Sequence, residues 1–101
     1  MNELKPENTH TLDQPIYQGD NEITEITLRK PRAGELRGVS LADLVNLDVA
    51  ALHKLLPRIS APTLAVHDVE KLDPADLLQL GGIVAGFFMT KAMRESTGSP
   101  T

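Results

Sequence analysis

The side chains best suited to chemistry in this sequence are its histidines, and none has the neighbours that a reaction or a metal would need. The histidines are His10, His53 and His67. Among the histidines in predicted helical segments, only His67 has a potential second ligand three or four positions away, namely Glu70. A zinc site needs three or four protein ligands, so this pair predicts a solvated surface contact rather than a metal site. The chain has no cysteine, which excludes thiolate ligands, thiol nucleophiles and disulfides.

The serines and glycines do not form a catalytic or cofactor-binding motif either. None of the serines lies in a sequence that resembles a nucleophile elbow; they are Ser40, Ser60, Ser96 and Ser99. The closely spaced glycines Gly81, Gly82 and Gly86 lack the preceding strand and the following lysine of a phosphate-binding loop. We therefore expect no catalytic residue, no cofactor and no metal, and predict that the protein is not an enzyme.

Length and charge narrow the class of protein further. The chain has 101 residues, of which 41% are apolar, and 14 acidic against 10 basic groups give a net charge of −4. A chain of this length forms one domain at most and buries roughly 65% of its unfolded surface. Its acidity disfavours nucleic acid as a partner. Small size, acidity and the absence of cysteine suit a soluble cytosolic protein.

The cations have one local concentration, at Arg29, Lys30, Arg32 and Arg37. This group has no stacking aromatics and no element that could contact base edges, so it does not predict a nucleic-acid site. We interpret it as a solvated junction between two halves of the chain, with contact to an acidic patch on a protein partner as the next interpretation.

No segment predicts targeting or membrane insertion. The N-terminus is polar, unlike a signal peptide. The longest uncharged stretch, Leu77–Thr90, has 14 residues, whereas a membrane span needs about 20. Residues 1–8 and 96–101 are expected to be disordered, and the second of these forms a flexible tail.

Residues 9–29 favour a β-hairpin. Two runs that mix β-branched and polar residues flank a turn at Gly19-Asp20-Asn21. Pro15 lacks a donor N–H, so the first run is expected at a sheet edge.

Residues 31–93 follow a helical period. Pro31 can begin a short helix that Gly38 ends, and Asp73-Pro74 is the clearest helix start in the chain. We expect helical segments at 31–37, at 41–45 with a Ser40 cap, at 49–56 with an Asp48 cap before Pro57 weakens the helix, at 64–72, and from Pro74 to about Met93. The prediction is an α+β fold in one domain, residues 9–95, with an N-terminal hairpin and about four short helices, the last the longest.

The last predicted helix combines a wide apolar stripe with three interior glycines. Each interior glycine costs on the order of 1 kcal/mol relative to alanine, so local propensity alone would not select Gly81, Gly82 and Gly86. Close packing against the chain's own hairpin would explain them, and so would a surface for another chain. Both interpretations stay open at this point.

The segment from Glu22 to Gly38 resembles a family signature. It is similar to the I-T-E-L-T-L-R-E-P-x-A-G-D-L-R-G motif of the tail assembly chaperones of Mu-like tailed bacteriophages and prophages, with Lys30 and Glu35 as departures. Leu55–Ser60 resembles the family's L-L-x-R-I-S/T segment, and Leu72–Phe88 its closing helix. The resemblance covers about residues 9–92.

The resemblance implies a non-enzymatic role in phage tail assembly. Such chaperones coat the long, aggregation-prone tape measure protein, help the tail tube protein to polymerise around it, and leave before the particle matures. The implied partners are therefore the tape measure protein, the tail tube protein and further copies of the chain, with neither nucleic acid nor membrane. The implied location is the host bacterial cytoplasm, outside the mature virion.

Two hypotheses connect this role to residues. The first assigns self-association or client contact to the apolar side of the last helix, at Leu80, Ile83, Val84, Phe87 and Phe88. The second places a structural motif at the joint between hairpin and helices, at Arg29, Pro31, Gly34, Leu36 and Arg37, where Gly34→Val should damage folding. The alternative function is a small acidic regulatory or antitoxin-like protein that binds a partner protein or DNA.

Overall fold

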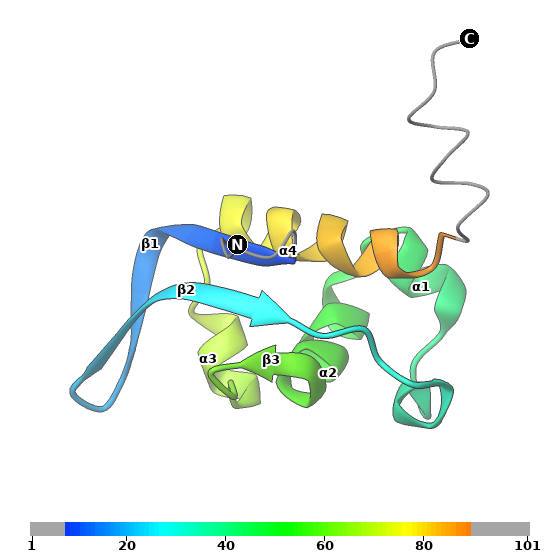
Figure 1. Cartoon of the computed structure of the whole chain (residues 1–101), viewed down its shortest axis with the longest axis horizontal. Coiled ribbons are helices and arrows are strands. Elements are labelled where there is room, and N and C mark those ends of the chain that lie inside the picture. The colour runs from blue at the N-terminus through cyan, green and yellow to red at the C-terminus, as the bar shows by residue number, and fades with distance from the viewer. Residues whose placement is uncertain (1–7, 90–101) are drawn as a thin grey trace, which may run out of the picture.

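The computed structural model describes residues 8–89, and it confirms the α+β class. A hairpin at the N-terminus is followed by a helical region (Figure 1). The elements, in order, are β1 (Thr9–Gln18), β2 (Asn21–Leu28), the 3₁₀ helix η1 (Ala33–Leu36), α1 (Leu41–Val45), α2 (Val49–Ile59), β3 (Ser60–Ala61), α3 (Val66–Glu70) and α4 (Pro74–Phe87). The last helix is the longest of the described elements, as the sequence predicts. The expectations for residues 1–7 and 90–101 lie outside the described residues.

The hairpin contributes one apolar face to the core. β1 pairs antiparallel with β2 around a turn in which Gly19 has a φ of +62°, a conformation that suits glycine. The register shifts between Thr11 and Ile16, so β1 carries a bulge. On the inner face Ile16, Ile23 and Ile26 are buried beneath the helices, which supply the cover that an isolated hairpin lacks.

A third strand, absent from the sequence prediction, completes the sheet. β3 pairs antiparallel with β2 through Thr27↔Ala61 and Leu28↔Ser60, giving the order β1-β2-β3. Two residues are too few to produce a period in the sequence, so only the tertiary contact defines this strand. It attaches the C-terminal end of α2 to the sheet.

Three of the five predicted helix starts are confirmed by their hydrogen bonds. The segment predicted at 31–37 is instead the short 3₁₀ helix η1, and the one predicted at 64–72 is shorter, at Val66–Glu70. The Ser40 hydroxyl accepts from the backbone N–H of Asp43 at 3.3 Å, and the Asp48 carboxylate accepts from that of Ala51 at 3.0 Å. Asp73 accepts likewise from Ala75 at 3.1 Å. Each cap satisfies a backbone donor that the first helical turn leaves unpaired.

Two predicted helix ends need correction. α2 does not weaken after Leu56 but continues through Pro57 to Ile59. Pro57 has no backbone N–H to donate, but burial of the Ile59 side chain stabilises the additional turn. α4 ends at Phe87, not near Met93. The N–H groups of Phe88 and Met89 bond three residues back, to Ala85 and Gly86, which marks a tightened last turn.

The core lies between the inner face of the hairpin and the helices α2 and α4. Its largest fully buried side chains come from the hairpin and from the helical region. They are Ile26, Leu28, Leu44, Leu52, Leu55, Leu56, Ile59, Leu64 and Leu80. β1 runs alongside α4 in Figure 1, and the two are in contact. Among residues 8–89, no helix is long and apolar enough to cross a membrane.

Candidate functional site

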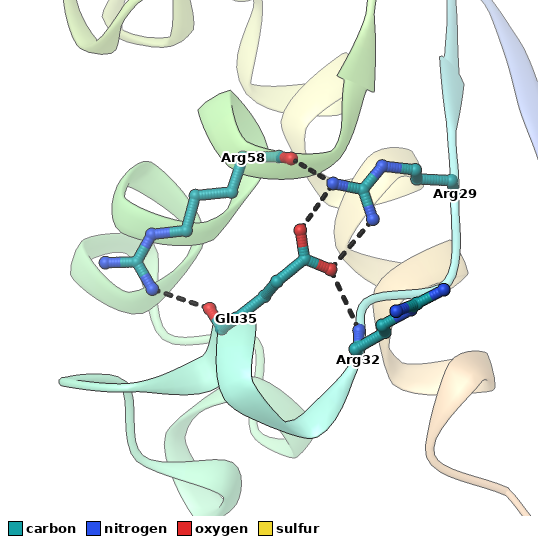
Figure 2. Close-up of polar contacts among 4 residues, drawn as sticks. All are labelled: Arg29, Arg32, Glu35 and Arg58. Atoms are coloured by element: carbon teal, nitrogen blue, oxygen red, sulfur yellow. Dashed lines mark hydrogen bonds and ion pairs between the residues drawn. The ribbon is translucent and has the colours of Figure 1, made fainter.

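The loop after β2 is held by one charged network, drawn in Figure 2. The Arg29 guanidinium donates to both carboxylate oxygens of Glu35, at 2.8 and 2.5 Å, in a bidentate pair. The same carboxylate accepts from the backbone N–H of Arg32 at 2.9 Å. Glu35 thus closes the 3₁₀ turn on itself and ties it to the end of β2.

Arg58 on α2 fixes the other side of this loop. Its Nη1 donates to the backbone oxygen of Glu35 at 2.6 Å, and the Arg58 carbonyl accepts from Arg29 at 2.9 Å (Figure 2). The same Nη1 also donates to the backbone oxygen of Arg37 at 3.0 Å. The backbone N–H of Arg29 also donates to the Ile59 carbonyl at 3.0 Å. Hydrogen bonds to backbone carbonyls and to the Glu35 carboxylate therefore join the end of the hairpin to the loop and to the last turn of α2.

The network lowers the pKa of Glu35 from 4.5 to about 2. The main cause is the side-chain hydrogen bond from Arg29, and the backbone N–H of Arg32 adds to it because both favour the ionised carboxylate. The same pair raises the pKa of Arg29. Both groups therefore stay charged across the physiological range.

The five predicted motif residues lie in or beside this loop, but in unequal roles. Arg29 is central to the network, Arg37 offers its carbonyl to Arg58, and Leu36 packs against the core. Pro31 is half-buried at the start of the loop. Gly34 is exposed, and a Cβ added there would meet no atom within 4 Å, so the structure gives no steric reason for glycine at that position.

Helix α4 divides the residues predicted for self-association or client contact into two groups. Leu80 and Val84 are fully buried in the chain's own core. Ile83, Phe87 and Phe88 are partly buried and pack against its edge. The two interpretations of this helix therefore apply to different residues, because the stripe holds both core positions and positions that another chain could reach.

The side of α4 that faces away from the core carries no charge. Asp76 is the only charged residue from Pro74 to Met89, and it is buried. Leu78 is 55% exposed, Gly82 is exposed, and a Cβ at Gly82 would meet nothing within 4 Å. Gly81, in contrast, is buried against the side chains of Leu47 and Leu52. Only one of the adjacent glycines is thus needed for packing inside the chain.

Two buried carboxylates were missed by the sequence analysis. Asp76 accepts hydrogen bonds from the N–H groups of Asp13 and Gln14 and from His10. Asp68 on α3 accepts from the backbone N–H of Ala65 and from the Gln18 side chain, both at 2.9 Å. Their position in the first turn of a helix did not indicate burial, because acids are common there whether buried or exposed.

The hydrogen bonds to these carboxylates stabilise their charged forms. Burial acts to raise the pKa of Asp76, but the donors from Asp13, His10 and Gln14 together outweigh it and lower that pKa. For Asp68 the backbone N–H of Ala65 is the main cause of a lowered pKa. Within the described residues no group of three potential metal ligands comes together. The polar groups described here hold elements in place.

A small α+β domain with an internally satisfied polar network and an uncharged helix face is suited to protein–protein contact. Comparison with known sequences shows the family to which the chain belongs. Residues 9–89 match the family described as phage tail assembly chaperone proteins, E, or 41 or 14. The chain belongs to this phage tail assembly chaperone family, which confirms the resemblance in the loop motif and the last helix.

Two relatives come from Escherichia phage P2. The chain is 45% identical over 91 residues to its tail assembly protein E, covering 90% of the chain and 100% of that protein. It is 47% identical over 88 residues to tail assembly protein E′, covering 87% of the chain. The chain spans only 62% of the length of E′. No solved structure matches the chain.

Proposed function

We propose that the protein is a non-enzymatic chaperone that binds the tape measure protein during phage tail assembly. Membership of the tail assembly chaperone family supports the role in tail assembly and favours it over an antitoxin-like alternative. The observation that carries the client-binding step is the uncharged outer side of α4. A chaperone for an extended helical client needs an apolar surface that it can share, and needs no catalytic group.

The client-binding surface in this proposal follows α4 from Leu78 to Phe88. Leu78 supplies half-exposed apolar area, and Gly82 leaves room for a second helix to approach closely. Ile83, Phe87 and Phe88 extend the surface at its edge with the core. The fully buried members of the helix, Leu80 and Val84, hold it against the sheet and contribute indirectly.

We further propose where and when the protein acts. It works in the host bacterial cytoplasm, keeps its client soluble while the tail tube protein polymerises, and is absent from the mature virion. Mass spectrometry of purified particles tests the last point, since a structural tail component would be retained there.

Co-expression with the candidate tape measure protein tests client binding. The wild-type chain should keep that protein soluble and co-purify with it. Leu78→Asp places a charge on the α4 surface without touching the core, so it should fold normally and lose the client. A client that stays insoluble with the wild-type chain would overturn the proposed function.

Leu41→Asp is the matched control for this experiment. Leu41 is a leucine of nearly the same exposure, 53%, on α1, a helix that also exposes Val45. We expect this variant to retain the client. Retention by Leu78→Asp and loss by Leu41→Asp would assign the client to α1 and contradict the surface proposed on α4.

A further inference from the structure

The loop after β2 reverses the charge balance of the chain. Residues 29–37, which we call the basic loop, contain four cations and Glu35 as the single acid. The whole chain, in contrast, has 14 acidic against 10 basic groups. The cations of the basic loop are Arg29, Lys30, Arg32 and Arg37. In Figure 1 this loop, between β2 and α1, lies at one end of the long axis of the molecule.

The network of Figure 2 holds the backbone of the basic loop and leaves three of its cations unpaired. Arg32 donates its backbone N–H to Glu35 at 2.9 Å, and Arg37 offers its carbonyl to Arg58 at 3.0 Å. Lys30, Arg32 and Arg37 are all exposed, and their side chains make no hydrogen bond or ion pair within residues 8–89. Figure 2 shows the Arg32 side chain directed away from the Glu35 carboxylate. The loop therefore presents these cations on a backbone that is already fixed.

The positive surface is short. Residues 9–28, before the basic loop, contain no lysine or arginine. After the loop, Asp43 and Asp48 line a small cavity together with Gly38 and Lys54, so acids are present again directly beyond it. A long polyanion would reach past the basic loop and meet this negative charge, whereas a short anionic segment would not.

The unpaired cations suit carboxylates that are spaced along a peptide. Arg32 and Arg37 flank η1 and lie about 10 Å apart, because a 3₁₀ helix rises about 2 Å per residue. About three residues of an extended peptide cover that distance. A guanidinium can pair with a carboxylate through two parallel hydrogen bonds, as Arg29 does with Glu35 in the same loop.

We propose that the basic loop binds a short acidic segment of a partner protein. Aspartate or glutamate side chains about three residues apart in that segment pair with Arg32 and Arg37, and Lys30 adds a further contact. Because the loop backbone is held before binding, only side chains have to be ordered. A nucleic acid fits less well, since residues 29–37 contain no aromatic side chain on which a base could stack. This inference goes beyond the client binding proposed on α4 and does not depend on it.

Fluorescence anisotropy of a labelled hexaglutamate peptide tests this contact on the full chain. The wild type should bind the peptide at about 10 mM salt and release it at about 1 M salt, where charges are strongly screened. It should not bind labelled hexaglutamine under either condition. Arg32→Gln with Arg37→Gln should raise the Kd for hexaglutamate about tenfold or more, because two charge-assisted pairs are lost. Circular dichroism checks that this variant remains folded.

Lys30→Gln and Lys71→Gln form a matched pair of controls. Both remove one lysine charge, the first from the basic loop and the second from α3, where the Lys71 side chain is 49% exposed. Lys30→Gln should raise the Kd about threefold, and Lys71→Gln should change it by less than about twofold. Leu78→Asp, which is expected to lose the client, should still bind the peptide, so this inference and the proposed function can fail separately.

Three results would overturn the inference. The first is a wild type that does not bind hexaglutamate at low salt or binds hexaglutamine equally well. The second is an equal loss for Lys30→Gln and Lys71→Gln, which would show that the peptide responds to the net charge of the chain and not to the loop. The third is a single-stranded oligonucleotide that binds more tightly than the peptide and depends on Arg32 and Arg37, which would make the basic loop a nucleic-acid site.

Discussion

His10 Nε2 lies 2.9 Å from Asp76 Oδ1, which links the first strand of the chain to its last helix across 66 positions. The same carboxylate accepts from the backbone N–H groups of Asp13 at 2.8 Å and Gln14 at 3.1 Å. These two residues lie in the bulge where β1 loses its register with β2. A side chain of α4 therefore supplies the acceptors that the neighbouring strand does not offer.

Replacing Asp76 by alanine should destabilise the protein strongly. Asp76 is 1% exposed, and its removal leaves two backbone donors of the bulge without their acceptor. Leaving such a donor unsatisfied costs about 1–3 kcal/mol, so we expect a loss of at least 2 kcal/mol in the free energy of unfolding. Urea denaturation measures this loss.

Asp13→Ala is the control, because it removes an exposed carboxylate beside the network but keeps its backbone donor. Its free energy of unfolding should stay within about 0.5 kcal/mol of the wild type. Equal losses for the two variants would show that the carboxylate of Asp76 does not hold the bulge.

Acid should weaken the loop network through Glu35. Because the pKa of Glu35 is lowered to about 2 in the folded chain, its contribution to stability is full above pH 4.5 and is lost as the pH falls toward 2. Glu35→Gln should therefore be less stable than the wild type at neutral pH, and the difference should shrink between these two pH values. Urea midpoints of both proteins measure it, and a difference that does not change with pH would contradict the role of the ionised group.

Local features of this fold could be predicted from sequence, whereas contacts between distant segments could not. Ser40, Asp48 and Asp73 cap their helices as expected, because a cap acts within three residues of itself. Asp76 is also an acid in a first helical turn, yet its partners are 62 to 66 positions away. β3 is defined in the same way, by pairing with a strand far back in the chain.

In the candidate site, too, contacts between distant segments could not be predicted from the sequence. The apolar stripe of the last helix could be recognised, but it is too wide for its period to separate Leu80, in the core, from Leu78, at the surface. The family resemblance identified the residues of the loop motif as a structural joint. The partner that joins the motif to α2, Arg58, comes from another predicted helix, and nothing in the local pattern connects it to Glu35 or Arg37.

The two glycines of the loop motif should respond differently to alanine. Gly38 has a φ of +78°, a left-handed conformation that costs a side-chain-bearing residue about 1 kcal/mol. Gly34 has open space around it. Gly38→Ala should therefore lower the free energy of unfolding by about 1 kcal/mol, and Gly34→Ala should leave it nearly unchanged. Thermal and urea unfolding decide this, and the opposite order would assign the structural requirement to Gly34.

The adjacent glycines of α4 provide the sharpest comparison of packing with helix propensity. A Cβ at Gly82 would meet nothing within 4 Å, so Gly82→Ala should raise the free energy of unfolding by about 0.5–1 kcal/mol through helix propensity alone. A Cβ at Gly81 would lie 3.0 Å from Leu52 Cδ1 and 3.2 Å from Leu47 Cδ2. Leu52 is buried in the close-packed core and Leu47 is half-buried beside it. Leu47 already has a positive φ of 61°, which limits how its side chain can move aside.

Gly81→Ala should therefore be destabilising, because the contact with these leucines outweighs the same gain in propensity. The pair differs by one position in the same helix, so the difference between the two free energies of unfolding isolates the packing effect. If both variants were stabilised equally, the close approach of α4 to α2 would be loose enough to accept a methyl group. If Gly82→Ala were destabilising in the isolated chain, the outer side of α4 would not be the open surface proposed for the client.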